Sequence, residues 1–230
     1  MRITILAAVL VLLASGHVLA QYDKTPPSPP APKPVPRSSF IAAPVSAQVN
    51  FDAPREKMNL SLKEIYGGDF KKAGEEVGHV IEAMQSAADT TEGDALKANL
   101  LRSVVELENK RGRLRSGGSA TGEEMSAMFS RALQALADHH AVLAQSHFKS
   151  GNNVAAGQDL RASVLNANQS VVWGNVKLGD EETNRLSAAG RTAKSLMEQK
   201  TVDRNATAKL MTDLEHWVRN VRGRLPKAGA

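Results

Sequence analysis

The sequence has no cysteine, few aromatic residues and, after its first twenty residues, no long apolar run. Without cysteine the fold can have no disulfide, so core packing alone must stabilise it, and catalysis by a thiolate is excluded. Phe, Trp and Tyr make up only 4% of the chain, and its charges of both signs are interspersed. We therefore expect no nucleic-acid partner, because such surfaces combine a basic stripe with stacking aromatic side chains.

Proline is confined to the two ends of the chain. Seven prolines fall in the segment TPPSPPAPKPVPR (positions 25–37), and none occurs between Pro54 and Pro226. Because proline fixes φ and lacks an N–H donor, residues 21–50 are predicted to be a disordered proline-rich linker. It could act as a spacer, as a docking segment for an envelope-associated partner, or simply as a leader. Residues 51–225 are predicted to form one all-helical domain, and residues 226–230 a disordered tail.

The first twenty residues, MRITILAAVLVLLASGHVLA, have the pattern of a secretory signal peptide. Arg2 is the positive start, a short apolar stretch runs from Ile3 to Leu13, and small residues precede a cleavage site after Ala20. The alternative, a membrane anchor, needs a longer stretch of about 20 apolar residues. We therefore predict a periplasmic or secreted protein with no transmembrane segment after signal cleavage. The lack of cysteine favours a bacterial periplasm.

Helix start and stop signals divide residues 51–225 into seven segments, the first of them short. The expected N-terminal signals are Asp52 with Pro54, Thr91, Thr121 with Glu124, Asn152 or Asn153, and Asp180. The expected helices cover residues 54–66, 70–87, 92–113, 122–149, 153–173, 181–200 and 203–222, and a glycine-rich loop joins the third to the fourth. The predicted fold is an all-α bundle of antiparallel hairpins with about six to seven helices.

Two stretches of the sequence align without gaps: GDFKKAGEEV (positions 68–77) and GNNVAAGQDL (positions 151–160). In each, a glycine that permits positive φ ends one helix, and a small Ala-Gly pair opens the next. We expect a tight antiparallel hairpin at each stretch, in which the Ala-Gly pair lets the second helix approach the first closely. The residues that define these two turns are Gly68, Ala73, Gly74, Gly151, Ala156 and Gly157.

The second hairpin, LAQSHFKSGNNVAAGQDL, resembles half of a tetratricopeptide repeat. The two copies, at Gly68 and Gly151, lie much farther apart than the period of about 34 residues in that repeat. Paired hairpins in a bundle are therefore expected, and not a regular solenoid. A signal peptide followed by a helical domain with two glycine-turn hairpins of the type GD…A also resembles the bacterial YfdX family. That resemblance implies no catalytic residue, but a periplasmic, oligomerising helical protein linked to stress tolerance by a chaperone-like action.

Three of the six histidines, His139, His140 and His147, fall close together on one expected helix. His140 and His147 share the apolar face of that helix but lie about 10.5 Å apart along its axis. That separation is too large for one ion, whose ligand nitrogens lie about 2.0–2.1 Å from it. His139 lies at the edge of the same face. The three are therefore candidate metal ligands only with help from other helices, and no Glu-x-x-His pair accompanies them.

Two other interpretations of His140 and His147 stay open. They can be half-buried packing residues whose polar tips hydrogen-bond to neighbouring helices. They can also sense pH, because an imidazole titrates near 6.5 and charging it inside an apolar seam is unfavourable. In that case acidification loosens the bundle and exposes apolar surface. His79 and His216 are expected to point away from the apolar faces of their helices.

No catalytic motif accompanies these residues, because the sequence has no G-x-S-x-G, H-E-x-x-H, G-x-G-x-x-G or phosphate loop. We predict no catalytic residue and no cofactor. The predicted function is that of an exported, non-enzymatic helical protein, an interaction or chaperone-like stress-response module that acts through a protein partner or self-association. The alternative is a metal- or haem-binding bundle that uses His140 and His147.

Overall fold

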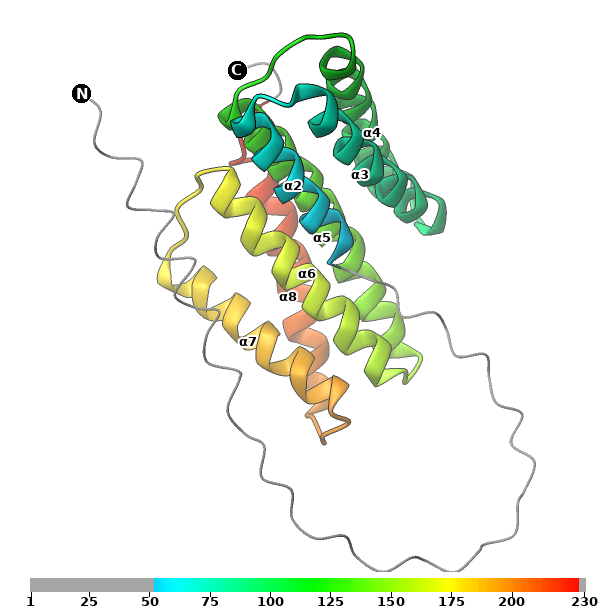
Figure 1. The fold of residues 1–230 in the computed structure, drawn as a ribbon. Helices are drawn as coiled ribbons and strands as arrows, with labels where there is room; N and C mark the ends of the chain where they lie inside the picture. The colour runs from blue at the N-terminus through cyan, green and yellow to red at the C-terminus, as the bar shows by residue number, and fades with distance from the viewer. Residues whose placement is uncertain (1–51, 228–230) are drawn as a thin grey trace, which may run out of the picture. The chain divides into compact units, whose positions relative to one another are not determined.

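The computed structural model describes residues 52–227, in which every regular element is an α-helix (Figure 1). These residues contain seven helices: α2 (Ala53–Gly67), α3 (Phe70–Thr90), α4 (Asp94–Arg115), α5 (Gly122–Lys149), α6 (Asn153–Trp173), α7 (Asp180–Met197) and α8 (Arg204–Arg222). The predicted all-α bundle is therefore confirmed. The predicted signal peptide, the proline-rich linker and the last three residues of the predicted tail lie outside the described residues.

Each of the two predicted glycine turns closes a helical hairpin. Gly68 has a φ of 80° just beyond α2, and Gly151 has a φ of 82° just beyond α5. In both turns the next amide, of Asp69 or Asn152, donates to the carbonyl oxygen five residues earlier at 2.9 Å. The side chain of the same residue then accepts a hydrogen bond from a backbone amide and caps the following helix. Glycine is required because the left-handed backbone is strained for other residues.

The glycines of the Ala-Gly pairs make a different contact from the predicted one. A Cβ atom added at Gly157 would lie 2.7 Å from the carbonyl oxygen of Ala193 and 2.9 Å from the amide nitrogen of Met197, both in α7. A Cβ atom at Gly74 would lie 3.4 Å from Cβ of Leu114 in α4. The glycines therefore admit the helix that follows each hairpin, whereas Ala73 of the first pair accepts a hydrogen bond from Ser61 of α2, the first helix of its hairpin, at 3.1 Å.

The internal repeat accordingly contains three helices rather than two. The alignment that pairs Gly74 with Gly157 also pairs Leu114 with Met197, the residues that pack against these two glycines. Thus α2, α3 and α4 correspond to α5, α6 and α7, and the alanines of the two Ala-Gly pairs are fully buried at equivalent places. Helix α8 falls outside this scheme and packs mainly against α5 and α7.

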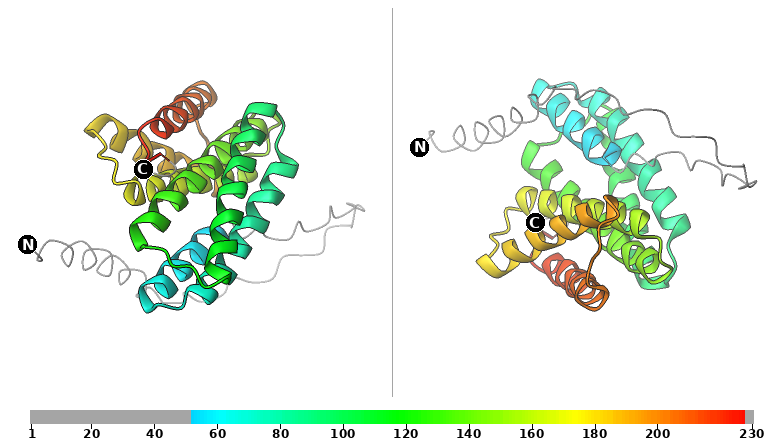
Figure 2. Two further views of the ribbon diagram at one scale, coloured as in Figure 1. Left: turned by 90° about the horizontal axis from the view of Figure 1, so that it is seen from above. Right: turned by 90° about the horizontal axis from the view of Figure 1, so that it is seen from below.

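The apolar side chains form two cores that meet in α5. The first core joins α2, α3, α4 and the part of α5 up to Leu136, and the second joins the rest of α5 to α6, α7 and α8. Figure 2 shows α7 and α8 on one side of the bundle and α2 on the other. Every residue of α5 from Met128 to Ala141 is buried except Arg131. Helix α5 is thus surrounded in this stretch, where the sequence pattern predicts one apolar face.

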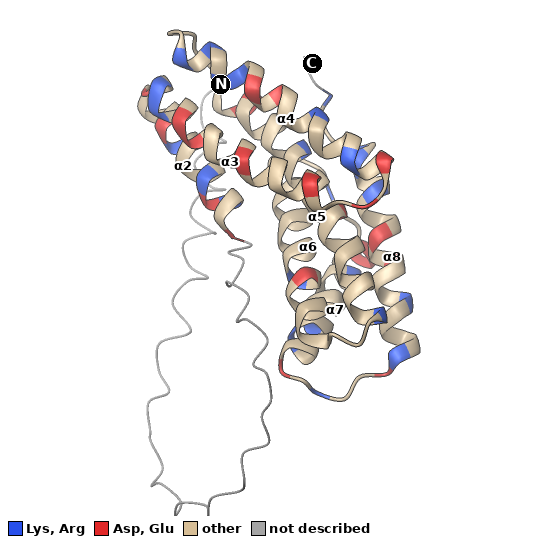
Figure 3. Cartoon of the chain, turned by 90° about the vertical axis from the view of Figure 1, so that its right-hand side faces the viewer, with Lys and Arg blue, Asp and Glu red and all other residues tan. Residues whose placement is uncertain are grey.

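The distribution of charge follows this arrangement. Lys, Arg, Asp and Glu are common along the outer helices, as Figure 3 shows for α3, α4 and α8. Helix α6 carries only two charged residues, Asp159 and Arg161. Asp159 is buried and Arg161 is exposed. Within residues 52–227, no helix has the length and apolar character that a membrane crossing requires.

Two helix starts differ from the predicted ones. Thr91 follows α3 and does not cap α4, which begins at Asp94. Asp180 is the first residue of α7, and Gly179 is its cap. The predicted caps Thr121 and Asn152 are confirmed, since each side chain accepts a hydrogen bond from a backbone amide three residues on.

Candidate functional site: a histidine network between the two cores

His139 and His140 lie where α5 passes from the first core, which ends at Leu136, into the second, which begins at Ala137. Successive helical residues are about 100° apart around the axis, so the two imidazoles leave α5 in different directions. Their ring centroids are 5.1 Å apart in an edge-to-face arrangement. Five polar side chains from three segments are linked at this junction, and we call them the histidine network: Thr91, His139, His140, His147 and Asp159.

His139 joins α5 to the end of α3. The hydroxyl of Thr91 donates to the carbonyl of Ala87 at 2.6 Å, so its oxygen accepts from Nδ1–H of His139 at 2.8 Å. His139 is only 4% exposed. Burial, followed by repulsion from the neighbouring His140, lowers the pKa of His139 to about 4, and Asp159 opposes this shift. The imidazole of His139 is therefore neutral at pH 7.

Asp159 joins the two other histidines. Its Oδ1 accepts a hydrogen bond from Nδ1 of His140 at 2.9 Å, and its Oδ2 accepts one from Nδ1 of His147 at 2.8 Å. The Asp159 side chain is 4% exposed, whereas that of His147 is 38% exposed. Both oxygens of this buried carboxylate are thereby hydrogen-bonded, as the burial of a charge requires. His140 and His147 therefore share a partner as well as a helix face.

The first hairpin carries a different ion pair at the equivalent place. The alignment of the two hairpins pairs Lys57 with His140 and Glu76 with Asp159. The side chains of Lys57 and Glu76 form a salt bridge of 3.0 Å. The side chain of lysine titrates far above the pH range in which imidazole does. The duplicated position thus holds a lysine in the first hairpin and a histidine in the second.

The three histidines do not converge on one point. His139 binds Thr91, while His140 and His147 bind Asp159. In the described part of the chain, no group of three or more His, Asp or Glu side chains is arranged to hold a metal ion. Asp159 does hold two rings by Nδ1, which is how carboxylates orient metal-bound histidines. An ion would have to bind at the Nε2 atoms, with ligands from elsewhere.

The structure changes the physical basis of the predicted pH sensing. The sequence places the cost of a buried charge at His140 and His147, but in the structure the Nδ1 atoms of both face the carboxylate of Asp159. His139 faces the hydroxyl of Thr91 instead, and burial lowers its pKa to about 4. The pH-sensing role of His140 and His147 stays a prediction, and His139 joins them as a candidate.

Sequence reasoning misses two members of the network, Thr91 and Asp159. Asp159 is the one acidic residue of α6 and lies among its buried positions, opposite His147 across the hairpin turn. That pattern is a usable signal for a buried polar contact. Thr91 lies far from His139 in the sequence, and no local pattern indicates their contact.

Three other residues, His79, His216 and Trp217, do not belong to the histidine network. His79 and His216 are exposed, as predicted. Trp217 is buried in the second core, and its indole N–H donates to Glu182 in α7 at 2.8 Å.

Comparison with known protein families, curated proteins and solved structures finds no match for this chain. The resemblances to the YfdX family and to tetratricopeptide repeats therefore rest on their sequence motifs.

Proposed function

We propose that the protein is exported and non-enzymatic, and that it binds other proteins in a chaperone-like way when its surroundings become acidic. The observation that supports this proposal is the position of the histidine network at the junction of the two cores. The periplasm follows external pH, so a titratable junction gives an exported protein a direct response to acid. The core surface released there would bind apolar segments of a partner protein or of a second copy.

Protonation of His139 supplies this response. The polar groups that face it are Thr91 at the end of α3, His140 in α5 and Asp159 in α6. Between a pKa of about 6.5 in the unfolded chain and about 4 in the folded one, the unfolded state binds the extra proton. The contribution of His139 to stability is therefore complete above pH 6.5 and is lost as the pH falls toward 4. The added proton goes to Nε2, because Nδ1–H already donates to Thr91, so what destabilises this junction is a charge placed in a buried position.

The first test is a titration from about pH 7.5 to about pH 4.5, followed by ANS fluorescence and by far-UV circular dichroism. Wild-type protein should gain ANS fluorescence toward acid while it keeps its helical signal. His139→Gln keeps a hydrogen-bond donor but cannot titrate in this range, so its gain should be smaller. His79→Gln removes an exposed histidine of α3 and is the matched control. The proposal fails when wild type, His139→Gln and His79→Gln give the same curve.

The same titration of the His140→Gln, His147→Gln double variant tests the other two rings. A smaller acid response than that of the wild type would assign part of the sensing to them. An unchanged response would limit the sensing to His139. Because glutamine can still donate a hydrogen bond to the carboxylate of Asp159, the double variant separates titration from packing.

Binding is tested separately from the conformational response. The mature protein should suppress the aggregation of an acid-unfolded client protein at about pH 5 and not at about pH 7.5. A pull-down from the periplasm at the same two pH values identifies partners. N-terminal sequencing of the protein recovered there should begin at Gln21, and a mature chain that still carries residues 1–20 would contradict export with signal cleavage.

A metal- or haem-binding bundle is the second candidate function, because Asp159 orients both His140 and His147 by Nδ1. Elemental analysis of the protein purified from its native compartment tests it. Near-stoichiometric zinc, iron or copper that is lost in His140→Ala would favour this function over the acid-dependent one. Metal content below about a tenth of an equivalent would exclude tight binding of these ions.

A further inference from the structure

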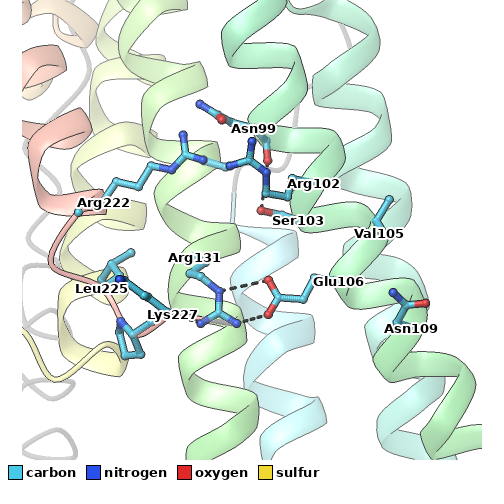
Figure 4. Close-up of a pocket in the computed structure, with 13 residues that line it drawn as sticks. Asn99, Arg102, Ser103, Val105, Glu106, Asn109, Arg131, Arg222, Leu225 and Lys227 are labelled. Carbon is cyan, nitrogen blue, oxygen red and sulfur yellow. Dashed lines mark hydrogen bonds and ion pairs between the residues drawn. The ribbon is translucent and has the colours of Figure 1, made fainter. Parts of the chain in front are cut away.

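A cleft is lined by residues of α4, α5, the end of α8 and the segment that follows α8. It has a volume of about 510 Å³, with α4 as one wall, α5 as its floor and the segment after α8 as the other wall (Figure 4). This volume lies in the range of about 300–1,000 Å³ that is typical of small-molecule sites. The cleft belongs neither to the histidine network nor to the glycine turns.

The charge in the cleft is unbalanced. Its charged lining residues are four cations and one carboxylate, namely Arg102, Arg131, Arg222, Lys227 and Glu106. The carboxylate of Glu106 is already engaged by both sides of the Arg131 guanidinium, with one N–O distance of 3.1 Å. Arg131 also donates to the carbonyl of Pro226 at 2.7 Å, which holds the C-terminal segment against α5. Arg102, Arg222 and Lys227 are left as excess positive charge.

Arg102 and Arg222 are directed toward each other across the cleft (Figure 4). Neither takes part in any ion pair or side-chain hydrogen bond found within residues 52–227. Burial, and then repulsion by Arg102, lower the pKa of Arg222, and Asp138 opposes this shift. The carboxylate of Asp138 is bound by Arg219 at 3.2 Å. Two like charges therefore face each other in a partly enclosed space, where an anion between them would be favourable.

The rest of the lining combines apolar side chains with the polar residues Asn99, Ser103 and Asn109. Val105, Ala135 and Leu225 contribute to its lining. Val105 is 56% exposed and Leu101, one turn earlier in α4, is 41% exposed, although both are large apolar residues. Apolar side chains beside a pair of arginines match a ligand with an anionic head and an apolar body. A nucleic acid is a poor match, because the cleft has no aromatic side chain for stacking.

We propose that this cleft binds a small amphiphilic anion, whose carboxylate or phosphate group lies between Arg102 and Arg222 and whose apolar part contacts Val105 and Leu225. Planar guanidinium groups suit either head group, because both offer paired oxygens. The site is distinct from the histidine network, and it stands or falls independently of the acid response.

The test is isothermal titration calorimetry of the mature protein at pH 7.5 with three probes that share one chain length: octanoate, octyl phosphate and 1-octanol. The first two carry the proposed head groups, and the neutral alcohol carries only the apolar part. Octanoate or octyl phosphate should bind with a dissociation constant below about 1 mM, at least about tenfold more tightly than 1-octanol. The stronger of the two anions identifies the head group. Binding should weaken as salt is added, because the charges are partly exposed.

Three variants locate the site. Arg102→Gln and Arg222→Gln should each weaken binding of the anionic probe at least about tenfold. Arg191→Gln, which removes an exposed arginine of α7, should leave it unchanged. Arg102 is exposed, so its variant should fold, and its melting temperature should be no lower than that of the parent because a like-charge contact is removed. The proposal is overturned when neither anion binds, when 1-octanol binds equally well, or when Arg102→Gln and Arg191→Gln behave alike.

Discussion

Two successive residues of α5, Asp138 and His139, are buried titratable groups, and burial shifts the pKa of each. Burial raises the pKa of the Asp138 carboxyl, and Arg219 opposes this shift. Burial lowers the pKa of His139 to about 4. Both shifts favour the neutral form, but their effects on stability have opposite signs. As the pH falls, protonation of Asp138 stabilises the folded state relative to the unfolded one. Protonation of His139 destabilises it.

The pH dependence of the free energy of unfolding follows from His139. From about pH 6.5 to about pH 4 the wild-type protein should lose about 3 kcal/mol relative to His139→Gln, since one pKa unit corresponds to about 1.4 kcal/mol. Urea unfolding of both proteins at about pH 7.5 and about pH 4.5 measures this difference. A difference that does not change between the two pH values would contradict the lowered pKa.

Asp159 is expected to be far more important for stability than its counterpart Glu76. Asp159→Ala leaves two imidazole donors without their acceptor, and an unsatisfied buried group costs about 1–3 kcal/mol. Glu76→Ala removes a salt bridge to Lys57 whose side chains are 34% and 16% exposed, which should cost less than about 1 kcal/mol. Urea unfolding at pH 7.5 compares the two variants. Equal losses would show that the second hairpin does not depend on its buried carboxylate.

At the scale of the elements, the turns were predictable and the packing of their glycines was not. Gly68 and Gly151 end helices by local backbone chemistry, which a short sequence pattern reports. The contact of Gly157 with α7 joins two separate helices, and only the packing of α7 against the α5–α6 hairpin defines it. For the same reason the shared face of His140 and His147 follows from helical phase, whereas their common partner in α6 does not.

Glycine substitutions test this packing within one pair of helices. Gly157→Ala places a Cβ atom within 2.9 Å of backbone atoms of Ala193 and Met197, which cannot move aside as a side chain could. We expect a loss of about 1–3 kcal/mol in the free energy of unfolding. Gly190→Ala, inside α7 with no atom within 4 Å of the added Cβ, is the control and should gain about 0.5–1 kcal/mol. Thermal unfolding followed by circular dichroism distinguishes the two. Similar behaviour of both variants would contradict the close approach of α6 and α7.

At the scale of the whole molecule, the number of helices and the all-α class followed from capping residues, glycine breaks and the lack of proline between positions 54 and 226. The central place of α5 did not follow. Its apolar pattern is that of a helix with one buried face, yet Gln134 and Asp138 are also buried, because α8 supplies polar partners for them. Only the tertiary arrangement determines which polar residues find such partners.

The chain holds one tryptophan beside each core, which allows the cores to be observed separately. Trp173 packs on Phe129 of the first core with ring centroids 5.9 Å apart, and Trp217 is buried in the second. Trp173→Phe and Trp217→Phe each leave one reporter. We expect fluorescence and circular dichroism to give the same urea midpoint and slope within each single-tryptophan protein. A fluorescence midpoint that differs from the circular dichroism midpoint of the same protein would show that the cores unfold independently.

A duplicated protein usually offers its two halves as separable units, but the shared α5 removes that option here. The first three helices obtain part of their core from α5, and the second copy of the repeat, α5 to α7, begins with the same helix. A break in the glycine-rich loop before α5 would leave α2, α3 and α4 without a wall of their core. We therefore expect the two copies to form a single cooperative unit, because each core depends on the same helix.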